Sequence, residues 1–564
     1  MKKLLVLLCA LFLVQGATAQ VWLPVNSDLL NLASFRMQST GGTIEDDLDN
    51  AIDGTDIFAV DGARIYTNLS NLVTGGEHQG DNMYSDNMLL IGATSPIYKG
   101  YKLTAFYGKA KQSSSKDFLS DEIYRQDINS DQVFDSTALN HLDSNAVYDF
   151  SQNSLVLNLG KKMGEETEIA FTYIRSGSTT KNDRADSTYY TRMNISPAVT
   201  SVLRYGSGYD NSESTFPITT YALSYCKPFR DWKLRGDAFL VTGGINSSTE
   251  SLNHSFIDGY PRASDTTYTY NSTRTITGED GFTANLAGVS LLLSDENKQT
   301  GLLWEVGGNF GMIFGSGDND YVEEFNYLER EELSPPEIRV LDSTYTDSTN
   351  GNISVSGTGM GANGRIEWQI SDNVVFGLGC MYNSYSMTLE EDRNVRTDIV
   401  SDFDDGDTQG SDPDDYTITV NGNDRDETVT TEIKINRIAI PAGVELNFGK
   451  NKDWYMRLGA VAVGSRTEIT DETVVDSLYI GSSVTARGDG SSSTSYLTSS
   501  TLADNETNTS SSTYQYVDYV YGLGWKPSPN LSLDLIGMFD FSGVELLSTD
   551  WLQSLRLSAT LNIY

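Results

Sequence analysis

Apolar and polar residues alternate with a period of two over much of the chain. Ile438, Ile440 and Val444 fall on one side of one such segment, and Arg437 and Glu445 fall on the other. A period of two indicates a β-strand, because successive side chains of a strand point to opposite faces. The same alternation recurs at 232–240, 366–370 and 531–541. We therefore expect an all-β protein.

The spacing of these segments predicts hairpins with short turns at one end and long loops at the other. Short turns are expected near 96–98, 162–166, 229–231, 295–300, 371–373, 449–453 and 527–529. Long segments rich in Ser, Thr, Asn, Asp and Gly separate the hairpins, near 112–151, 179–216, 246–280, 315–356, 390–429 and 471–511. This asymmetry is the plan of a transmembrane antiparallel β-barrel of the outer membrane, with short periplasmic turns and long extracellular loops.

The number of strands follows from the hairpins. Seven hairpins contain fourteen strands, and the segment 551–564 adds a fifteenth at the carboxyl terminus. Bacterial single-chain barrels have even strand numbers, so one more strand is expected near 57–67. We predict about sixteen strands, with fourteen as the alternative.

Tryptophans support this orientation, because five of the seven lie within a few residues of an expected short turn. They would form an aromatic girdle at one membrane interface. These residues are Trp232, Trp304, Trp368, Trp454 and Trp525. A soluble sandwich with scattered core tryptophans is the alternative, since alternation alone does not separate a sandwich from a barrel.

The first nineteen residues have the layout of a secretory signal. Lys2 and Lys3 precede the apolar run 4–14, and Ala17 and Ala19 supply small residues for cleavage. We divide the remaining chain into an N-terminal periplasmic or plug segment, 20–56, and a barrel, 57–564. These features place the protein in the outer membrane of a Gram-negative-type bacterium, in contact with its lipids.

A short helix is expected at 43–53, within the N-terminal segment. Ile44, Leu48 and Ile52 recur at a spacing of four, and Thr43 can cap the helix. The two cysteines of the mature chain, Cys226 and Cys380, fall on opposite faces of their strands. We expect them to be free thiols.

The segment 61–72 resembles the N-terminal signature of the outer-membrane long-chain fatty-acid and aromatic-hydrocarbon transporter family. The matching positions are Asp61, Asn68 and Leu72, with Ser70 at the place of a small residue, while Leu69 stands where the signature has proline. The resemblance implies that the N-terminal segment plugs the lumen and that hydrophobic substrates leave sideways through the wall. The other interpretation of the N-terminal segment is an ordinary periplasmic extension that leads into the first strand.

The chain is strongly acidic, with 39 basic and 77 acidic residues, a formal net charge of -38 and a pI near 4.3. Such an excess repels phosphate backbones, so nucleic acid is not an expected partner. The expected loop at 390–427 is the densest acidic segment and should attract cations.

Two acidic segments could bind Ca²⁺, although solvated loops are the simpler explanation. Both supply oxygen ligands at close spacing: Asp127, Asn129, Asp131 and Asp135 in one, and Asp402, Asp404, Asp405 and Asp407 in the other. No other cofactor is expected.

Charged residues that alternate with the apolar set should line the lumen, because a charge on the lipid face costs about 2–4 kcal/mol at the membrane midplane. These expected pore-lining residues are Arg235, Asp237, Glu305, Arg365, Glu367, Arg437, Glu445, Arg457 and Asp534. Opposed charges in a pore select solutes by charge. A lumen closed by salt bridges is the alternative.

Catalysis is not expected, because the three histidines, His78, His141 and His254, lie in predicted loops far apart in sequence. We first predict passive transport of small solutes or ions, favouring cations. The second interpretation is a plugged transporter for hydrophobic compounds, which an apolar patch inside the barrel would favour. The third is a surface or assembly barrel that binds partners through its loops. The oligomeric state is left open.

Overall fold

The computed structural model describes most of the chain. The described ranges are 34–70, 87–126, 136–164, 166–194, 201–229, 232–259, 267–297, 299–332, 338–404, 415–421, 425–449, 452–478, 482–487, 491–496, 506–539 and 556–563. The expected signal segment lies outside them.

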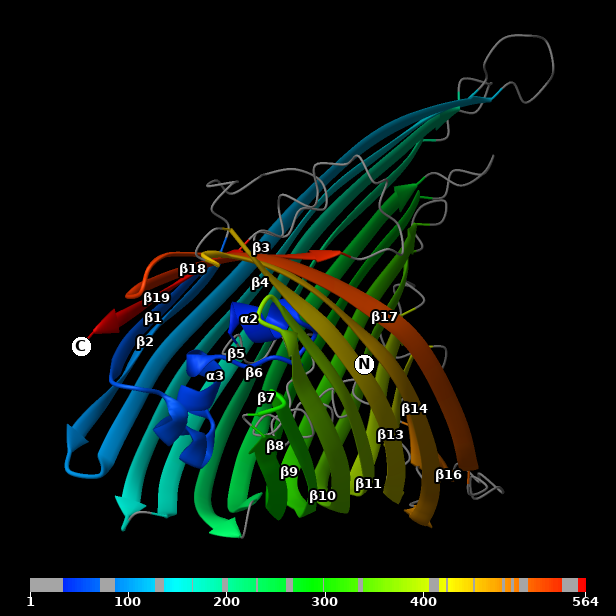
Figure 1. Cartoon of the computed structure of the whole chain (residues 1–564). Coiled ribbons are helices and arrows are strands. Elements are labelled where there is room, and N and C mark those ends of the chain that lie inside the picture. The colour runs from blue at the N-terminus through cyan, green and yellow to red at the C-terminus, as the bar shows by residue number, and fades with distance from the viewer. Residues whose placement is uncertain are drawn as a thin grey trace.

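All strands belong to one antiparallel sheet (Figure 1). In the first half of the chain they are β1 (Ala63–Ser70), β2 (Asn87–Tyr98), β3 (Tyr101–Gln126), β4 (Ser136–Met163), β5 (Thr167–Asn194), β6 (Ser201–Phe229), β7 (Trp232–Gly259), β8 (Thr267–Asn297) and β9 (Leu302–Glu332). In the second half they are β10 (Ile338–Ser371), β11 (Val374–Asp404), β12 (Tyr416–Asn421), β13 (Arg425–Phe448), β14 (Trp454–Leu478), β15 (Ser482–Arg487), β16 (Ser492–Tyr496), β17 (Glu506–Ser528), β18 (Leu531–Phe539) and β19 (Arg556–Ile563).

The sheet closes into a ring of sixteen strands, because β1 pairs with both β2 and β19. Three of the nineteen strands lie outside the ring: β12 pairs with the far end of β11 and with β15, and β15 pairs with β16. The expected sixteen-stranded barrel is therefore confirmed. Its first strand is β1, close to the predicted 57–67, and its last is β19, within the predicted 551–564.

The strands are much longer than the sequence predicted. Most residues expected in long loops instead continue the strands, so that β10 has 34 residues and β8 has 31. A transmembrane strand needs only about 9–11 residues. The wall therefore continues far beyond the membrane, and the segments near 179–216, 246–280 and 315–356 are mostly strand. Outside the membrane, polar side chains on both faces of a strand are compatible with an antiparallel ladder in water. The polar composition of these segments therefore predicted loops where the structure has strands.

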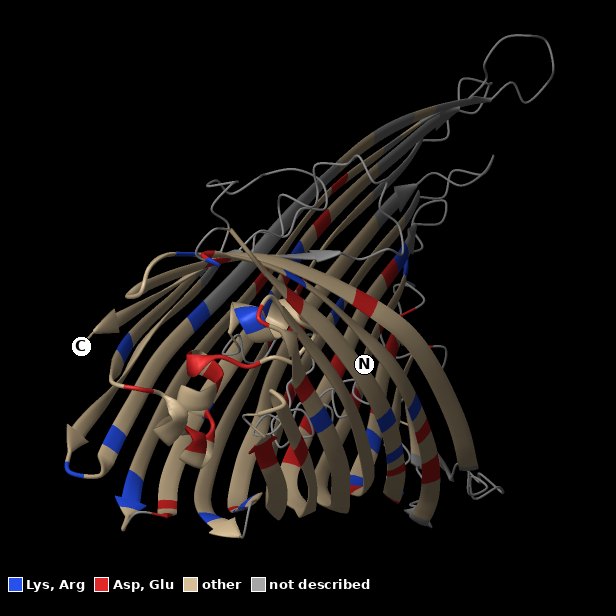
Figure 2. Ribbon diagram, viewed as in Figure 1, with Lys and Arg blue, Asp and Glu red and all other residues tan. Residues whose placement is uncertain are grey.

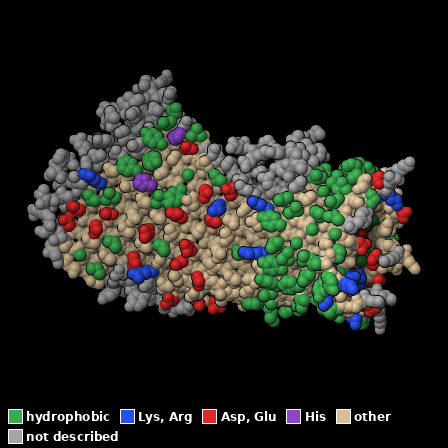
Figure 3. All heavy atoms as spheres, turned by 90° about the vertical axis from the view of Figure 1, so that its left-hand side faces the viewer, with side chains coloured by type: hydrophobic (Ala, Val, Ile, Leu, Met, Phe, Trp, Pro, Cys, Tyr) green, Lys and Arg blue, Asp and Glu red, His purple; other side chains and the backbone are tan. Residues whose placement is uncertain are grey.

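An apolar belt crosses the face of the barrel seen in Figure 3, and exposed apolar side chains near the short turns continue it on strands around the ring. On β9, for example, Val306, Phe310, Met312 and Phe314 point outward and are exposed. A closed antiparallel barrel satisfies every backbone hydrogen bond without an edge in lipid, and its outer face must be apolar. This is the architecture of an outer-membrane barrel. No helix in the described part of the chain is long and apolar enough to cross a membrane.

The N-terminal residues 34–62 lie inside the barrel near its short turns, and we call them the inner segment (Figure 1). The segment contains α2 (Phe35–Ser39), α3 (Asp47–Ile52) and the 3-10 helix η1 (Gly54–Ala59). Helix α2 lies against β14, β17 and β18, whereas η1 lies against β3, β4, β5 and β6. The inner segment therefore contacts opposite sides of the wall.

Helix α3 lies within the helix predicted at 43–53 but begins later. Asp46 caps it by accepting a hydrogen bond from the Leu48 amide, and Asp49 completes a capping box. The prediction that Thr43 is the cap is wrong, because its hydroxyl donates to the Thr40 carbonyl at 2.7 Å. Leu48 and Ala51 of α3 pack with Tyr66 and Phe106 in an apolar cluster against the wall. Burial of this face explains why so short a helix is stable.

Candidate functional site

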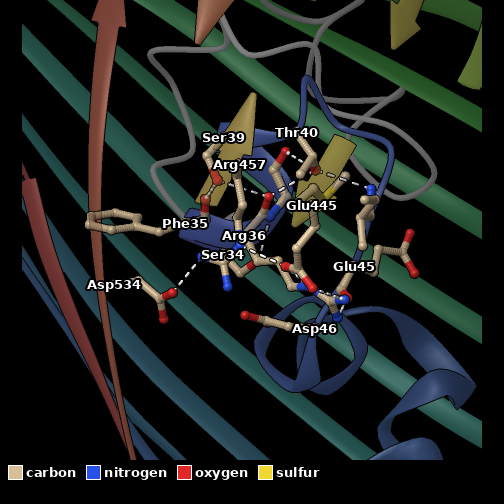
Figure 4. A network of polar contacts seen from close by, with 12 residues as sticks. Ser34, Phe35, Arg36, Ser39, Thr40, Glu45, Asp46, Glu445, Arg457 and Asp534 are labelled. Atoms are coloured by element: carbon tan, nitrogen blue, oxygen red, sulfur yellow. Dashed lines mark hydrogen bonds and ion pairs between the residues drawn. The ribbon is translucent and has the colours of Figure 1, made fainter. Parts of the chain in front are cut away.

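The contact between the inner segment and the wall contains three clusters of arginines and carboxylates. In the first, Arg36 of α2 donates to both oxygens of Glu445, at 2.8 and 3.0 Å. Arg457 donates to the same carboxylate at 2.7 Å and to Asp534 at 2.5 Å (Figure 4). Two arginines thus share Glu445, and the chain Arg36–Glu445–Arg457–Asp534 joins α2 to β13, β14 and β18.

The second cluster is centred on Arg235 of β7. Its guanidinium donates to Asp53 at 2.5 Å, to Asp56 at 2.8 Å and to Asp237 at 2.9 Å. Ser290 also donates to Asp237 at 2.7 Å. The Arg235 side chain is only 4% exposed, so its charge depends on these carboxylates rather than on water. Two of the three acids belong to the inner segment, which carries much of the acidic charge inside the wall in Figure 2.

The third cluster is centred on Arg365 of β10, which pairs with Glu45 of the inner segment and with Glu305 of β9. The distance between Arg365 and Glu305 is 2.5 Å. Arg64 of β1 adds a pair with Asp47 at 3.1 Å. The inner segment is therefore held by ion pairs at several points around the wall.

A row of glycines lets the inner segment approach the backbone of the wall. Gly377, Gly443 and Gly459 lie side by side on β11, β13 and β14, and we call them the glycine seat. A Cβ atom on Gly443 would lie 2.2 Å from the Thr40 carbonyl oxygen, and one on Gly459 would lie 2.3 Å from the Gly41 nitrogen. Only glycine permits this contact.

Four aspartates of the inner segment have raised pKa values. Burial raises the pKa of Asp53 to about 7, against the opposing effect of Arg235. Burial likewise raises the pKa of Asp46 to about 6, and it raises the pKa of Asp49 and Asp56 as well. The docked inner segment therefore binds protons more readily than a released one, whose aspartates would have pKa values near 4.

We expect docking of the inner segment to weaken as the pH rises. A raised pKa contributes stability that is present below about pH 4 and is lost as the pH rises through about 6 to 7, because the docked state then has to give up its protons. Hydrogen exchange of amides 47–59, corrected for intrinsic rates, should show protection falling by the order of tenfold from pH 5 to pH 8. The Asp53→Asn variant should show a smaller fall, and protection that increases with pH would contradict the assignment.

An apolar cluster lies on the inward face of β6 to β13, farther from the short turns than the ion pairs. We call it the inner apolar patch. Its buried members come from neighbouring strands: Ile218, Val241, Ala284, Leu286, Ile313, Val355, Tyr385, Met387, Leu389, Ile433 and Ile435. They alternate with outward side chains along each strand, as the burial pattern of β11 shows. An inward apolar surface of this kind is unusual, because the interior of a channel barrel is polar.

The nine expected pore-lining residues all lie on the strands of the ring, but most do not line an open passage. Seven of them, namely Arg235, Asp237, Glu305, Arg365, Glu445, Arg457 and Asp534, belong to the three ion-pair clusters. Glu367 lies on the same face of β10 as Arg365, two residues farther along the strand. Arg437 lies beyond the clusters, beside the inner apolar patch. The inner segment occupies the lumen at the level of the clusters, so the geometry does not support an open diffusion pore.

The five tryptophans lie at the short-turn end of the barrel. Trp232 and Trp304 pack edge to face with centroids 5.9 Å apart, and Trp454 stacks on Trp525 at 5.4 Å. Trp368 is exposed on β10. The position of these side chains at the margin of the apolar belt fits an aromatic girdle, which stays a prediction.

Other expected sites fall partly outside the described residues. Asp127, Asn129, Asp131 and Asp135 lie outside them, as do Asp405 and Asp407, whereas Asp402 and Asp404 lie near the end of β11. Among the described residues, no group of three or more acidic, histidine or cysteine side chains could hold a metal. Calcium binding stays a prediction.

The segment that resembles the transporter signature is built into the wall. Asp61 is exposed just before β1, and Asn68 and Ser70 lie within it, while Leu72 is outside the described residues. The described part of this segment therefore forms the end of the inner segment and strand β1 of the wall.

The histidine prediction needs a correction, because His141 and His254 lie in strands β4 and β7 rather than in loops. His78 is outside the described residues. The part of the chain that is described contains Cys226 and Cys380 as free thiols, as predicted. The absence of catalysis stays a prediction.

No protein-family model and no curated protein matches this chain. Among solved structures, a ferric enterobactin receptor from Pseudomonas aeruginosa, in complex with enterobactin, covers 89% of this chain and 81% of its own, with 9% identity and a TM-score of 0.26. The siderophore receptor PirA from the same organism has 9% identity, a coverage of 89% and 80%, and a TM-score of 0.23. The FrpB iron transporter from Neisseria meningitidis has the same identity and coverage and a TM-score of 0.22. Because these TM-scores are far below 0.5, we draw no argument about substrate or mechanism from them.

Proposed function

We propose that this protein is a plugged outer-membrane transporter for hydrophobic compounds. The observation that carries the proposal is the position of the inner apolar patch beside a lumen that the inner segment occupies. Ligand sites are usually apolar surfaces with a few placed polar groups. A wall that turns Leu286, Met387 and Ile433 inward gives an apolar molecule a surface that an ion channel would not need.

The inner segment fits the role of the plug. It contacts opposite sides of the wall, and its ion pairs with Arg235 and Arg365 fix its position. The resemblance of 61–72 to the hydrophobic-compound transporter family supports the same assignment. Passive diffusion of ions, our first prediction, is the less favoured function.

Binding of an apolar probe tests the proposal. The full-length protein in amphipol should bind N-phenyl-1-naphthylamine, measured by its fluorescence. Met387→Asn places an amide in the buried patch and should weaken binding by about tenfold, because a buried side chain of this size contributes about 1.5–3 kcal/mol.

Val400→Asn is the matched control, because Val400 lies farther along the same strand, is exposed and points outward. It should bind the probe as the wild type does. Heat-modifiable migration on gels shows that each variant is folded. Equal weakening by both variants, or no binding by the wild type, would overturn the proposal.

A further inference from the structure

We propose that Lys109 of β3 and Arg175 of β5 bind the phosphate-bearing headgroup of an outer-leaflet lipid on the outward face of the barrel. This lipid belongs to the membrane around the protein and is not the transported compound. The inference therefore goes beyond the proposed function and does not rest on it.

Both cations lie where the apolar belt ends on their strands. On β3, Tyr107 is exposed on the outward face, and Lys109 is the next outward residue. On β5, Phe171 is exposed on the outward face, and Arg175 lies farther along the same face. The short turns lie at the other margin of the belt, so the two cations mark its outer margin. Basic side chains are visible along this margin in Figure 3.

This margin is the level at which lipid headgroups meet the barrel. A charge is costly at the midplane of the membrane but not at its interface, where a long basic side chain reaches the polar region. The short turns face the periplasm in an outer-membrane barrel, so the outer margin of the belt lies in the outer leaflet. In a Gram-negative outer membrane this leaflet consists largely of glycolipids whose sugars carry phosphate groups. Phosphates are therefore the anions that these cations meet.

Within the part of the chain that the structure describes, neither cation has a carboxylate partner. The outward positions beside them are uncharged: Leu89, Asn153, Gly177 and Pro217 along the row of Lys109, and Ile91, Tyr107, Leu155 and Thr219 along the row of Arg175. The first outward acids beyond these rows are Asp149 and Glu213, which are in register with Lys181. Glu213 pairs with Lys181 at 2.6 Å. In a chain with a net charge of -38, two exposed cations without acids form a site of opposite sign to the rest.

Neutral groups between the two cations suit a phosphate. The Tyr107 hydroxyl donates to Oδ1 of Asn153 at 3.2 Å, which leaves the Nδ2 group of Asn153 as a donor for another acceptor. A Cβ atom on Gly177, in register with Asn153, would meet nothing within 4 Å, so the surface beside this amide is open. An arginine binds phosphate through two parallel hydrogen bonds, whereas a lysine supplies a point charge.

The outer margin on the opposite part of the ring has the same components but keeps its cations paired. There the Tyr382 hydroxyl donates to Asn436 at 3.0 Å, as Tyr107 does to Asn153. The exposed cations beside this pair have their own acids: Lys434 lies 3.3 Å from Glu432, and Arg466 lies 3.4 Å from Glu468. The two margins therefore differ in whether the protein itself supplies the anions.

Lipids that differ only in their phosphates test the inference. The full-length protein in a neutral detergent would be titrated with diphosphorylated lipid A and, separately, with the same lipid after removal of both phosphates. Native mass spectrometry measures the bound fraction. The wild type should bind the phosphorylated lipid at least about tenfold more tightly, because each cation near an anionic headgroup contributes the order of fivefold in affinity. The double variant Lys109→Gln, Arg175→Gln should lose this preference, and Arg175→Lys should retain part of it.

The double variant Lys434→Gln, Arg466→Gln is the matched control, because it removes the same charge at the same margin from cations that already have acids. It should bind both lipids as the wild type does, and heat-modifiable migration shows that each variant is folded. Equal binding of the two lipids by the wild type, or an equal loss of preference in both double variants, would show that no specific site exists. Displacement of the lipid by an excess of inorganic phosphate would show a site for free anions, and the assignment to a lipid headgroup would then be wrong.

Discussion

Replacement of Arg235 by glutamine is expected to release η1 and α3 from the wall. The change removes the cation shared by Asp53, Asp56 and Asp237 and leaves Asp237, only 1% exposed, without its charge partner. Loss of one partner from a buried ion pair costs about 3–5 kcal/mol. The population of the released inner segment should therefore rise by about two to four orders of magnitude. Hydrogen exchange of amides 47–59 measures this directly.

Channel recordings provide a second measurement of the same variant. If the inner segment closes the lumen, Arg235→Gln should conduct ions in planar bilayers far more often than the wild type. Arg466→Gln removes an exposed arginine and should change neither measurement, because exposed ion pairs contribute at most about 1 kcal/mol. Unchanged exchange in folded Arg235→Gln would show that the ion pairs do not hold the segment.

Replacement of Gly443 by alanine should displace α2 and the following turn without changing any charge. The added Cβ would lie 2.2 Å from the Thr40 carbonyl oxygen and 2.7 Å from the Thr43 hydroxyl, so the inner segment has to move away. Overpacking of this kind costs about 1–3 kcal/mol, and here the obstacle is backbone, which yields less readily than a side chain. Exchange of amides 37–44 should rise by one to two orders of magnitude.

Gly177→Ala is the matched control for this substitution. Gly177 lies on β5, and a Cβ atom there would meet nothing within 4 Å. It should leave exchange and conductance as in the wild type. An inner segment that remains equally protected in both alanine variants would show that the glycine seat is not a close contact in solution.

The membrane-spanning half of the fold could be predicted from the sequence, because lipid imposes a strict alternation on the strands. The part of the wall outside the membrane could not be predicted. There water can solvate both faces of a strand, so the polar residues at 246–280 have the composition of a loop. Strand pairing there depends on the partner strand, as where Thr249 of β7 pairs with Gly278 of β8. A one-dimensional pattern does not contain these pairings.

The inward charges of the site could also be predicted, from the phase of residues such as Arg235 and Glu445. Their partners could not be predicted, because Asp53 lies 182 residues from Arg235 in the chain and Arg36 lies 409 residues from Glu445. Helix α2 was missed since it has only five residues. The glycine seat left a signal that could have been used: Gly377, Gly443 and Gly459 interrupt otherwise apolar strands near the short turns.

In the part of the chain that the structure describes, the ring is closed by its two shortest strands, β1 and β19. Ala63 of β1 pairs with Ile563 of β19, 500 residues farther along the chain, so the two halves of this contact meet only when the whole chain is present. Both strands have 8 residues, whereas β8 and β9 have 31 each and form as a local hairpin. Contacts between distant residues form slowly, because loop-closure entropy has to be overcome first. Within the described residues, most of the ladder can therefore form between strands that follow one another in the chain, whereas the eight described residue pairs of β1 and β19 await the last strand.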